Sequence, residues 1–399
     1  MKENFKKKIL DNGMTVLFEK RDLPVVSVAF AVRQGGENEI EDEKGISHFI
    51  EHMLYKGTKN RTSKQIAEEI EKNGGELNGF TSETMTAYWC KMPSDNLTIA
   101  LNVLSDLVKN PKFDEKELNK ERQVIFEEIK MYQDNPSAHC LIKIHECLFE
   151  KPFGIPLIGT YETMNSIDRK KIIEKFNAVY TPNNMILLVV GNADFDKIVD
   201  FAEKNFQKNS GKITIPKIKP KNEIKIETRK GIDQANLVFA YHIPYSDNKL
   251  SYAAEVLSCF MAEGMSSKLF EEIREKRNLA YSIHGGSESQ KNFAFNFIAV
   301  GTTKENVEKV KEIILKEFEN LCKNFSEKDL SEIKKQLIGN YKISMEDSKT
   351  QMVNILDYEI KGKAEDFYDF EKNISDVKLE DVKKLANIKK YSFFALTPE

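Results

Sequence analysis

An internal repeat divides the 399 residues into two similar halves. The segment 113–118 reads Phe-Asp-Glu-Lys-Glu-Leu, and it returns 212 residues later, at 325–330, as Phe-Ser-Glu-Lys-Asp-Leu. Such a period is far longer than the roughly 20–50 residues of a solenoid repeat. Because a chain of this length also exceeds one ordinary hydrophobic core, the repeat predicts two copies of one domain.

Helical patterns follow the repeated segment in both halves. They cover Glu115 to Met131 in the first half and Glu327 to Met345 in the second. Further along each half, a shorter helix leads into an apolar strand, at 185–190 in the first half and at 391–396 in the second. The elements therefore follow the same order twice, as expected for homologous domains.

The start of each half indicates β-structure. Residues 16–32 alternate in character and pause at Asp22-Leu23-Pro24, which predicts a β-hairpin, and residues 224–241 are similar. Together with the helices, these strands predict an α+β fold. We expect two homologous domains, each a mainly antiparallel β-sheet packed with helices.

The domain boundary is placed where the composition changes. Residues 208–220 contain two prolines, one glycine and one serine together with four lysines, a composition typical of a linker. We therefore expect an N-terminal domain over 1–210, a linker over 211–221 and a C-terminal domain over 222–399. A sequence of the form H-x-x-E-H, which places two histidines and a glutamate together, occurs only in the first half, so the N-terminal domain is expected to bind a metal and the C-terminal domain to carry no metal ligands.

The first half contains the sequence His48-Phe49-Ile50-Glu51-His52 in a mostly apolar, helix-like context. Helical residues four positions apart are neighbours, so His48 and His52 can place two nitrogens on one zinc ion. Glu51 lies at the edge of the same face, where it can take a proton from a water on the metal without displacing a ligand. This H-x-x-E-H order is the inverzincin signature.

A catalytic zinc takes three protein ligands and keeps one position open, so a third ligand is required. The helical segment 121–129 offers three carboxylates. Glu121 and Glu128 are seven residues apart and share one face, whereas Glu127 lies about 100° away. One carboxylate of the shared face can ligate the ion while the other anchors a ligand histidine. The sequence of this segment alone does not decide which of Glu121 and Glu128 ligates the ion and which anchors the histidine.

A second group of metal-type side chains, His139, Cys140, His145 and Cys147, follows in the sequence. Cys140 and Cys147 fall on one helical face, but the two histidines point about 120° apart, so no single turn gathers all four. We interpret the group as core thiols with peripheral histidines.

The composition argues against several classes of partner. With a net charge of −3, the chain has no electrostatic reason to bind nucleic acid or an anionic membrane. No stretch approaches 18 apolar residues and no apolar segment follows the N-terminus, so we expect neither a membrane span nor a secretory signal. The five scattered cysteines are expected to be reduced, and we predict a cytoplasmic location.

The motifs resemble those of the M16 metallopeptidases (pitrilysin- or insulysin-like), most closely the short bacterial members related to mitochondrial processing peptidase β. The resemblance covers nearly the whole chain. It is carried by the H-x-x-E-H motif with its downstream glutamates and by the segments 12–16, 36–39, 45–58, 74–82, 121–136, 191–192 and 270–281.

The resemblance implies a role for each residue of the metal site. The family's distal ligand lies about 76 residues beyond the second histidine, and Glu128 matches this spacing. His48, His52 and Glu128 therefore look like zinc ligands, with one ion per chain. By the same comparison, Glu51 resembles the general base and Glu121 a carboxylate that supports the site. Two nitrogens and one oxygen also accept Mn²⁺ or Co²⁺.

Two further features come from the resemblance. The family's edge strand, which pairs with the substrate backbone by β-augmentation, is matched by Leu77, Asn78, Gly79, Phe80 and Thr81. Gly79 stands where the family often has alanine. In the second half, Arg274 and Tyr281 match an arginine–tyrosine pair that grips the substrate and stabilises the oxyanion.

The implied activity is that of a zinc-dependent endopeptidase that hydrolyses unfolded or short peptides inside a closed chamber. Long family members carry four such domains in one chain, whereas this chain has two. We therefore expect a homodimer in which the partner subunit can supply Arg274 and Tyr281. Two alternatives stay open: a non-catalytic structural or assembly subunit of a hetero-oligomer, and a peptidase dedicated to one peptide precursor.

Overall fold

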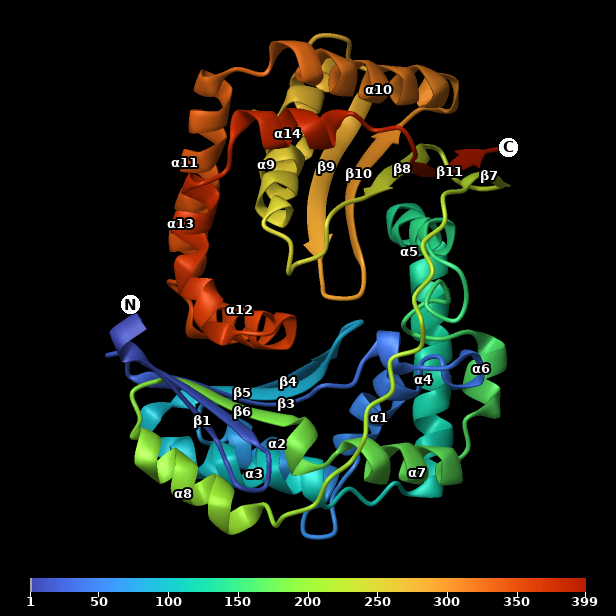
Figure 1. Cartoon of the computed structure of the whole chain (residues 1–399). Helices are drawn as coiled ribbons and strands as arrows, with labels where there is room; N and C mark the ends of the chain where they lie inside the picture. The colour runs from blue at the N-terminus through green and yellow to red at the C-terminus, as the bar shows by residue number, and fades with distance from the viewer. Residues whose placement is uncertain (1) are drawn as a thin grey trace. The chain divides into compact units, whose positions relative to one another are not determined.

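The computed structural model describes residues 2–399. These residues form two compact units, each built on one β-sheet with helices packed against it (Figure 1). The first unit comprises the chain up to Ile129 together with Ile155–Lys217 and Ser344–Tyr368. The second unit comprises Lys130–Gly154, Ile218–Ile343 and Asp369–Glu399.

The sheet of the first unit has the strand order β1-β2-β6-β3-β5-β4 in the described chain. The β2–β6 pair is parallel, and the other neighbouring pairs are antiparallel. Its strands are β1 (Phe5–Ile9), β2 (Thr15–Lys20), β3 (Val25–Val32), β4 (Glu76–Thr81), β5 (Thr86–Pro93) and β6 (Met185–Gly191).

The hairpin predicted over 16–32 is wrong, although both of its strands form. β6 lies between β2 and β3 and pairs with each, so that Leu187 has Val16 on one side and Phe30 on the other. All residues of β6 are buried, as in a strand covered on both faces. Pairing β2 directly with β3 would leave this apolar strand without its two neighbours, with its backbone groups unpaired.

The sheet of the second unit repeats this arrangement. Its order among the described residues is β7-β11-β8-β10-β9, with a parallel β7–β11 pair and antiparallel pairs elsewhere. The strands are β7 (Ile224–Arg229), β8 (Ala235–His242), β9 (Ala280–Ser289), β10 (Ala294–Thr302) and β11 (Ser392–Pro398). This order matches β2-β6-β3-β5-β4, so the predicted α+β fold of two similar, mainly antiparallel domains is confirmed.

Helices cover both faces of the first sheet, with α12 on one face and α2, α3 and α8 on the other (Figure 1). α3 packs against β3 and β5, and α12 packs against β3 and β6. The helices of this unit are α1 (Ile46–Leu54), α2 (Ser63–Glu71), α3 (Leu97–Lys109), α4 (Glu115–Asp134, as far as Ile129), α6 (Tyr161–Ser166), α7 (Arg169–Val179), α8 (Phe195–Asn205) and α12 (Ser348–Lys361).

In the second unit, α5 packs against β8 and β11, and α9 packs against β9 and β10. The helices of this unit are α5 (Pro136–Leu148), α9 (Leu250–Ala262), the π-helical turn η6 (Phe270–Glu275), α10 (Val307–Asn324), α11 (Glu327–Ser344), α13 (Phe370–Ser375) and α14 (Leu379–Ala386). α10 also contacts β8, while α13 and α14 pack against α9, so apolar helix faces close the core of this unit, as the amphipathic patterns require.

Each half of the sequence contributes one helix to the other unit. α5 belongs to the first half but buries Cys140 and Ile144 against the second sheet. α12, which begins 212 residues after α5, buries Met352, Ile355 and Leu356 in the first unit. The units therefore do not follow the single boundary expected at 211–221, although the passage from Lys217 to Ile218 falls inside that segment.

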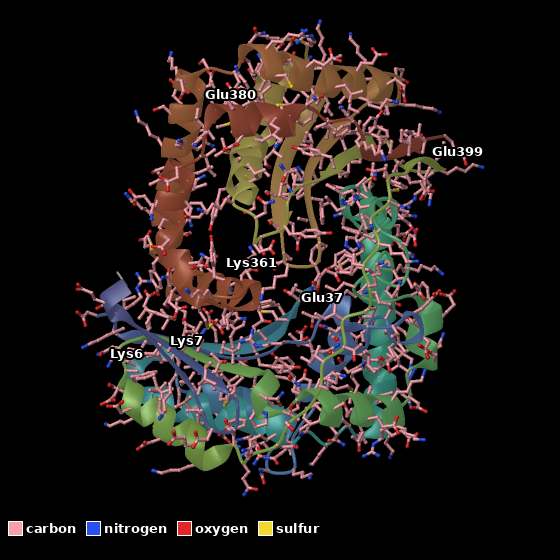
Figure 2. All side chains as sticks on the ribbon, in the orientation of Figure 1. Lys6, Lys7, Glu37, Lys361, Glu380 and Glu399 are labelled. Atoms are coloured by element: carbon pink, nitrogen blue, oxygen red, sulfur yellow. The ribbon has the colours of Figure 1, made fainter. Side chains whose placement is uncertain are left out.

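Charged side chains lie at the surface of each unit, with Lys6 in the first and Glu380 in the second as examples (Figure 2). Across residues 2–399, no helix combines the length and the apolar character needed to cross a membrane.

Candidate metal centre

The motif His48 to His52 lies on α1, which packs against β4 and β5. Its buried face consists of apolar residues such as Phe49, Ile50 and Met53, which leaves both histidines and Glu51 on the partly open face. The helix starts after Gly45, whose φ of 92° suits a residue without a side chain.

The start of α1 is fixed by a buried carboxylate that sequence reasoning missed. Glu39 accepts hydrogen bonds from the backbone N–H groups of Gly45 (3.0 Å) and Ser47 (2.8 Å). Burial raises the pKa of Glu39, while the ammonium of Lys44, 3.8 Å away, and these hydrogen bonds lower it. A negative group at a helix N-terminus is stabilised by the exposed N–H groups and the helix dipole, so Glu39 fixes where the motif helix begins.

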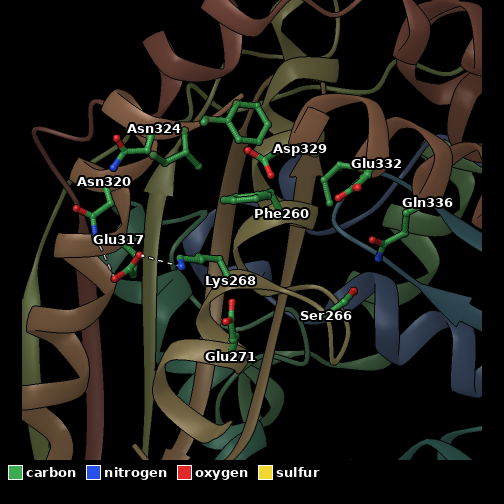
Figure 3. Close-up of a pocket in the computed structure, with 13 residues that line it drawn as sticks. Phe260, Ser266, Lys268, Glu271, Glu317, Asn320, Asn324, Asp329, Glu332 and Gln336 are labelled. Atoms are coloured by element: carbon green, nitrogen blue, oxygen red, sulfur yellow. Dashed lines mark hydrogen bonds and ion pairs between the residues drawn. The ribbon is translucent and has the colours of Figure 1, made fainter. Parts of the chain in front are cut away.

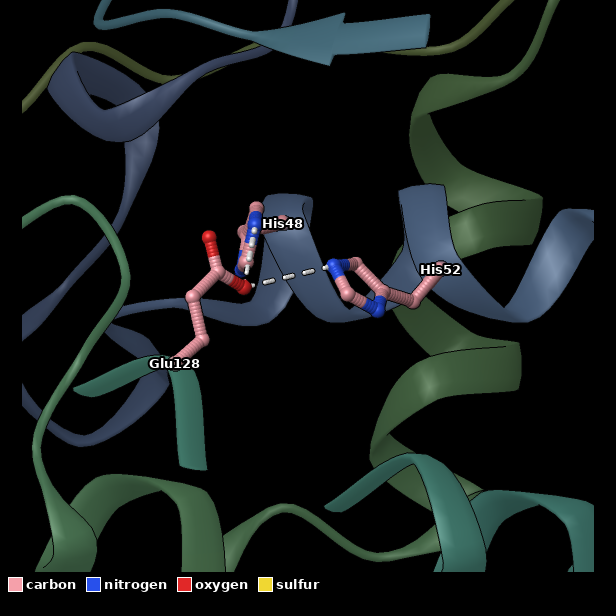
Figure 4. Close-up of side chains that lie close together, drawn as sticks. All are labelled: His48, His52 and Glu128. Atoms are coloured by element: carbon pink, nitrogen blue, oxygen red, sulfur yellow. Dashed lines mark ion pairs between the residues drawn. The ribbon is translucent and has the colours of Figure 1, made fainter. Parts of the chain in front are cut away.

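The structure brings His48, His52 and Glu128 together (Figure 4). Glu128 Oε2, on α4, lies 3.7 Å from Nε2 of each histidine, and the three ligand atoms are all within 4.8 Å of one another. Two donors that each lie about 2.1 Å from one tetrahedral zinc ion are roughly 3.4 Å apart. The geometry therefore fits a zinc ion, and this is the only such group of three or more metal-ligating side chains found in residues 2–399.

Burial shifts the pKa of two of these groups. It lowers the pKa of His48 to about 3, and the charge of His52 adds to this effect. The imidazole of His48 is therefore neutral near pH 7, as a metal ligand must be. Burial raises the pKa of Glu128, against the influence of His52.

Glu121 is buried on α4 and contacts His52 at Nδ1, the ring nitrogen that does not face Glu128. Its Oε2 is 3.2 Å from Nδ1 of His52, and its Oε1 is 2.6 Å from Nζ of Lys56. Burial raises the pKa of Glu121, but the hydrogen bonds from His52 and Lys56 outweigh burial and leave it lowered. An ionised carboxylate can only accept, so Nδ1 of His52 donates to Glu121, and in the neutral imidazole this leaves Nε2 with its lone pair on the side of Glu128.

Glu51 points from α1 towards β4. Its Oε2 accepts a hydrogen bond of 2.7 Å from the hydroxyl of Thr81. Burial raises the pKa of Glu51, the Thr81 hydrogen bond and His52 lower it, and Glu128 raises it. The carboxylate lies beside the three ligand side chains but is not a member of their group.

The strand predicted to bind substrate is β4, and it forms an edge of the first sheet. Within the described residues it pairs with β5 on one side and with no strand on the other. Gly79 and Thr81 lie on the strand face towards α1, since both approach Glu51. Their spacing of two residues is the signal that could have linked them to the base, because alternate strand residues share a face.

Arg274 and Tyr281 lie in the second unit, on η6 and β9. The guanidinium of Arg274 lies 6.0 Å from the centre of the Tyr281 ring and 4.8 Å from that of Phe270. Tyr281 is 74% exposed. The structure thus brings the predicted pair together, and its part in the metal site stays a prediction.

The second group of metal-type side chains, His139, Cys140, His145 and Cys147, belongs to the core of the second unit. Cys140 and Cys147 are buried in the second unit, and burial raises the pKa of each thiol, to about 12 and about 11. The histidines are not peripheral as predicted. His139 is buried with Nε2 3.1 Å from Glu227, and the ring of His145 packs against those of Phe149 and Phe153.

A cavity of about 500 Å³ opens in the second unit between α9, η6, α10 and α11 (Figure 3). Its lining combines aromatic, amide and charged side chains, among them Phe260, Lys268, Glu271 and Gln336. Lys268 is paired with Glu317 across 3.8 Å. Since none of its lining residues belongs to the group of metal-ligating side chains, this cavity is not the candidate metal centre.

Comparison with known proteins shows the family of the chain. Residues 15–161 match the family described as Insulinase (Peptidase family M16), and residues 166–337 match the domain described as Peptidase M16 inactive domain. The chain is 32% identical over 395 residues to an uncharacterized zinc protease of Rickettsia felis, and the alignment covers 97% of this chain and 95% of that relative. It is 30% identical over 385 residues to the uncharacterized zinc protease YmxG of Bacillus subtilis, which spans 94% and 93%.

Solved structures share the fold. A protease from Helicobacter pylori superposes with a TM-score of 0.91 at 23% identity and covers 99% of both chains. A Peptidase M16 inactive domain from Pseudomonas fluorescens superposes with a TM-score of 0.89 at 20% identity and covers 99% of this chain and 98% of its own. With two family matches and relatives aligned over nearly the full length, this chain belongs to peptidase family M16.

Proposed function

We propose that the chain is a zinc-dependent endopeptidase that hydrolyses unfolded or short peptides. The observation that carries this proposal is the convergence of His48, His52 and Glu128 beside Glu51. The relatives named as zinc proteases support zinc as the metal, and we propose one ion per chain. Bound by these three side chains, zinc would polarise the scissile carbonyl and activate a water molecule near neutral pH.

Glu51 is proposed as the general base. It accepts the proton of the attacking water and then passes that proton to the leaving amine. Burial raises the pKa of Glu51, which brings it closer to neutral pH and favours both transfers. The hydroxyl of Thr81 occupies Oε2 at 2.7 Å and fixes the carboxylate in one orientation.

Glu121 is proposed to hold His52 rather than to bind the ion. Its hydrogen bond to Nδ1 fixes the ring orientation and the tautomer that leaves Nε2 free for a metal. Lys56 keeps Glu121 ionised through the 2.6 Å ion pair, so the carboxylate remains an acceptor.

β4 is proposed to hold the substrate by β-augmentation. Its free edge presents backbone N–H and C=O groups that an extended peptide can pair with, largely independently of the peptide sequence. The residues proposed to contact the peptide are Leu77, Asn78, Gly79, Phe80 and Thr81. Because Thr81 also contacts Glu51, a peptide bound along this edge would lie next to the base.

Arg274 and Tyr281 are proposed to grip the substrate and to stabilise the oxyanion. We further propose a homodimer with a closed chamber, in which each site takes this pair from the partner subunit. Mixing two inactive variants, Glu51→Gln and Arg274→Ala, tests the idea. Subunit exchange in such a dimer restores about one quarter of wild-type activity, because half of the dimers are mixed and one of their two sites is intact. If mixing restores no activity although mixed dimers form, the pair acts within its own chain.

A non-catalytic structural or assembly subunit is the second candidate. It is favoured by the match of residues 166–337 to a domain described as inactive and by the similarity of fold to a chain of complex III2 from Candida albicans, with a TM-score of 0.85 and 19% identity. The presence of all three ligand side chains and of Glu51 supports the peptidase. A peptidase dedicated to one precursor differs from a general one only in its range of substrates.

The proposal is tested by cleavage of a quenched, mixed-sequence peptide pool. The wild type and Glu51→Gln are compared after both are shown to bind one zinc per chain. Removing the base while keeping the ligands is expected to slow cleavage by a factor of about 100 or more. If neither protein cleaves, the second candidate gains support. If both cleave equally, Glu51 is not the base.

We also propose a cytoplasmic location. All five cysteines in the described chain are free, and four of them are buried. Free thiols fit a reducing compartment, and cell fractionation with an antibody to the protein is the direct check.

A further inference from the structure

The hydroxyl of Tyr55 is buried and has no hydrogen-bond partner among residues 2–399. Tyr55 follows the last residue of α1 and therefore lies one helical turn beyond Glu51. Buried polar groups are nearly always hydrogen-bonded, and an unpaired one is explained by strain, by a catalytic role or by a bound water or ion. The position of this oxygen therefore calls for an explanation.

The Tyr55 hydroxyl occupies space that exists only because residue 79 is glycine. A Cβ placed on Gly79 would collide with Tyr55 Oη, and it would lie 3.1 Å from Glu51 Oε1 and 2.9 Å from the carbonyl oxygen of Ala87. Tyr55 Oη and Glu51 Oε1 thus face the same small volume above the strand. The other oxygen of Glu51, Oε2, is already bound by Thr81.

The neighbouring tyrosines show that an unpaired hydroxyl is not a property of this layer. The ring of Tyr55 lies 5.9 Å from that of Tyr88, which lies 6.3 Å from that of Tyr180. The hydroxyls of Tyr88 and Tyr180 are bonded to each other at 2.7 Å. Of these three phenols, only Tyr55, the one closest to Glu51, lacks a hydrogen-bond partner within the described structure.

We propose that Tyr55 is a positioning residue for the general base: its hydroxyl donates a hydrogen bond to Oε1 of Glu51, directly or through one water, in the zinc-loaded protein. Gly79 supplies the space for this contact. The inference rests on the proposed function, because it assigns Tyr55 a task in orienting Glu51. With Thr81 on Oε2 and Tyr55 on Oε1, both carboxylate oxygens are held, and the plane of the carboxylate is fixed.

This role predicts an effect on turnover rather than on substrate binding. Tyr55 lies beneath β4 and not at its free edge, so removing its hydroxyl takes no contact from the peptide. The Tyr55→Phe variant keeps the ring and loses one hydrogen bond to a charged group. We expect kcat to fall about tenfold, with KM changed less than twofold and with zinc content unchanged.

Tyr180→Phe is the matched control, because it removes one phenol hydroxyl from the same layer. Its hydroxyl is bonded to Tyr88 and not to Glu51, so we expect lower stability but an unchanged kcat. Gly79→Ala tests the space itself and is expected to lower kcat at least as much as Tyr55→Phe does. Adding Tyr55→Phe to Gly79→Ala should then cost little more, since the hydroxyl has already been displaced.

A double-mutant cycle tests the contact without relying on activity. The unfolding equilibrium is measured for the zinc-loaded wild type, Tyr55→Phe, Glu51→Ala and the double variant, because alanine, unlike glutamine, leaves no oxygen that could accept from Tyr55. A hydrogen bond between the two residues gives a coupling of about fivefold or more in the unfolding constant, and additive effects overturn the proposal. An unchanged kcat in Tyr55→Phe overturns it as well. If the two residues are coupled but the wild type cleaves no peptide, the contact between them is supported and the proposed function is refuted instead.

Discussion

Glu121→Gln tests the proposed support of His52 without changing a proposed metal ligand. In the structure, Oε2 of Glu121 accepts from Nδ1 of His52 at 3.2 Å, and Oε1 pairs with Lys56 at 2.6 Å. Glutamine has the same shape but only one accepting oxygen, so it can keep one of these two contacts and must lose the other. Either loss weakens the support of His52.

The expected magnitude follows from this loss. Removing the hydrogen-bond partner of a ligating histidine lowers metal affinity by about 10–100-fold, which corresponds to about 1.4–2.7 kcal/mol of binding free energy. Competition with a chromophoric zinc chelator measures the change. Activity should return when zinc is added in excess, because the ligands and Glu51 remain in place.

Glu127→Gln is the control for this experiment, since Glu127 is exposed on the same helix and is absent from the metal group. Its zinc affinity should match that of the wild type within about twofold. Glu128→Gln, which removes a proposed ligand, should lose more affinity than Glu121→Gln. The reasoning is refuted if Glu121→Gln binds zinc as tightly as the wild type, or if excess zinc fails to restore its activity.

Three further predictions concern stability. Chelation of zinc should lower the melting temperature and re-addition restore it, since an ion at about 1,000 times its Kd stabilises by about 4 kcal/mol; a melting temperature independent of zinc contradicts the site. In the zinc-free protein, burial lowers the pKa of His48 to about 3 from 6.5. As the pH falls from about 6.5 towards 3, His48 takes up a proton in the unfolded chain but not in the folded protein, so the free energy of unfolding decreases. Urea unfolding across this range should show a flatter pH dependence for His48→Gln, and identical slopes argue against a buried neutral His48. Leu356→Ala on α12 removes a fully buried side chain and should lower the free energy of unfolding, measured in urea, by about 2–5 kcal/mol. A loss below about 1 kcal/mol means that α12 is not part of the core of the first unit.

Local pattern predicted most elements of the fold, and long-range pairing was the part that it could not supply. The two long helices were expected at Glu115 and Glu327, and α4 and α11 begin at these residues. The apparent hairpin over 16–32 failed because β6, far along the chain, takes the place between β2 and β3. Periodicity reports which residues form a strand, but it does not report which strand lies beside it.

The exchange of α5 and α12 escaped prediction for the same reason. Their apolar faces indicate burial, but nothing in the helices themselves states which sheet covers them. At the site, helical spacing was enough to put His48 and His52 side by side, and the family resemblance selected Glu128. The contact of Thr81 with Glu51 and the close approach of Gly79 to Tyr55 and Glu51 depend on how β4 packs against α1, which local spacing does not encode.

The central claim is that His48, His52 and Glu128 hold a zinc ion that works together with Glu51. The most direct measurement is the cleavage rate of one fluorogenic peptide while the zinc-free protein is titrated with zinc. The account predicts that the rate rises in proportion to bound zinc and levels off at one ion per chain. Glu51→Gln should bind the same amount of zinc and stay about 100-fold slower or more. A rate independent of bound zinc, or a Glu51→Gln variant as fast as the wild type, would contradict the account.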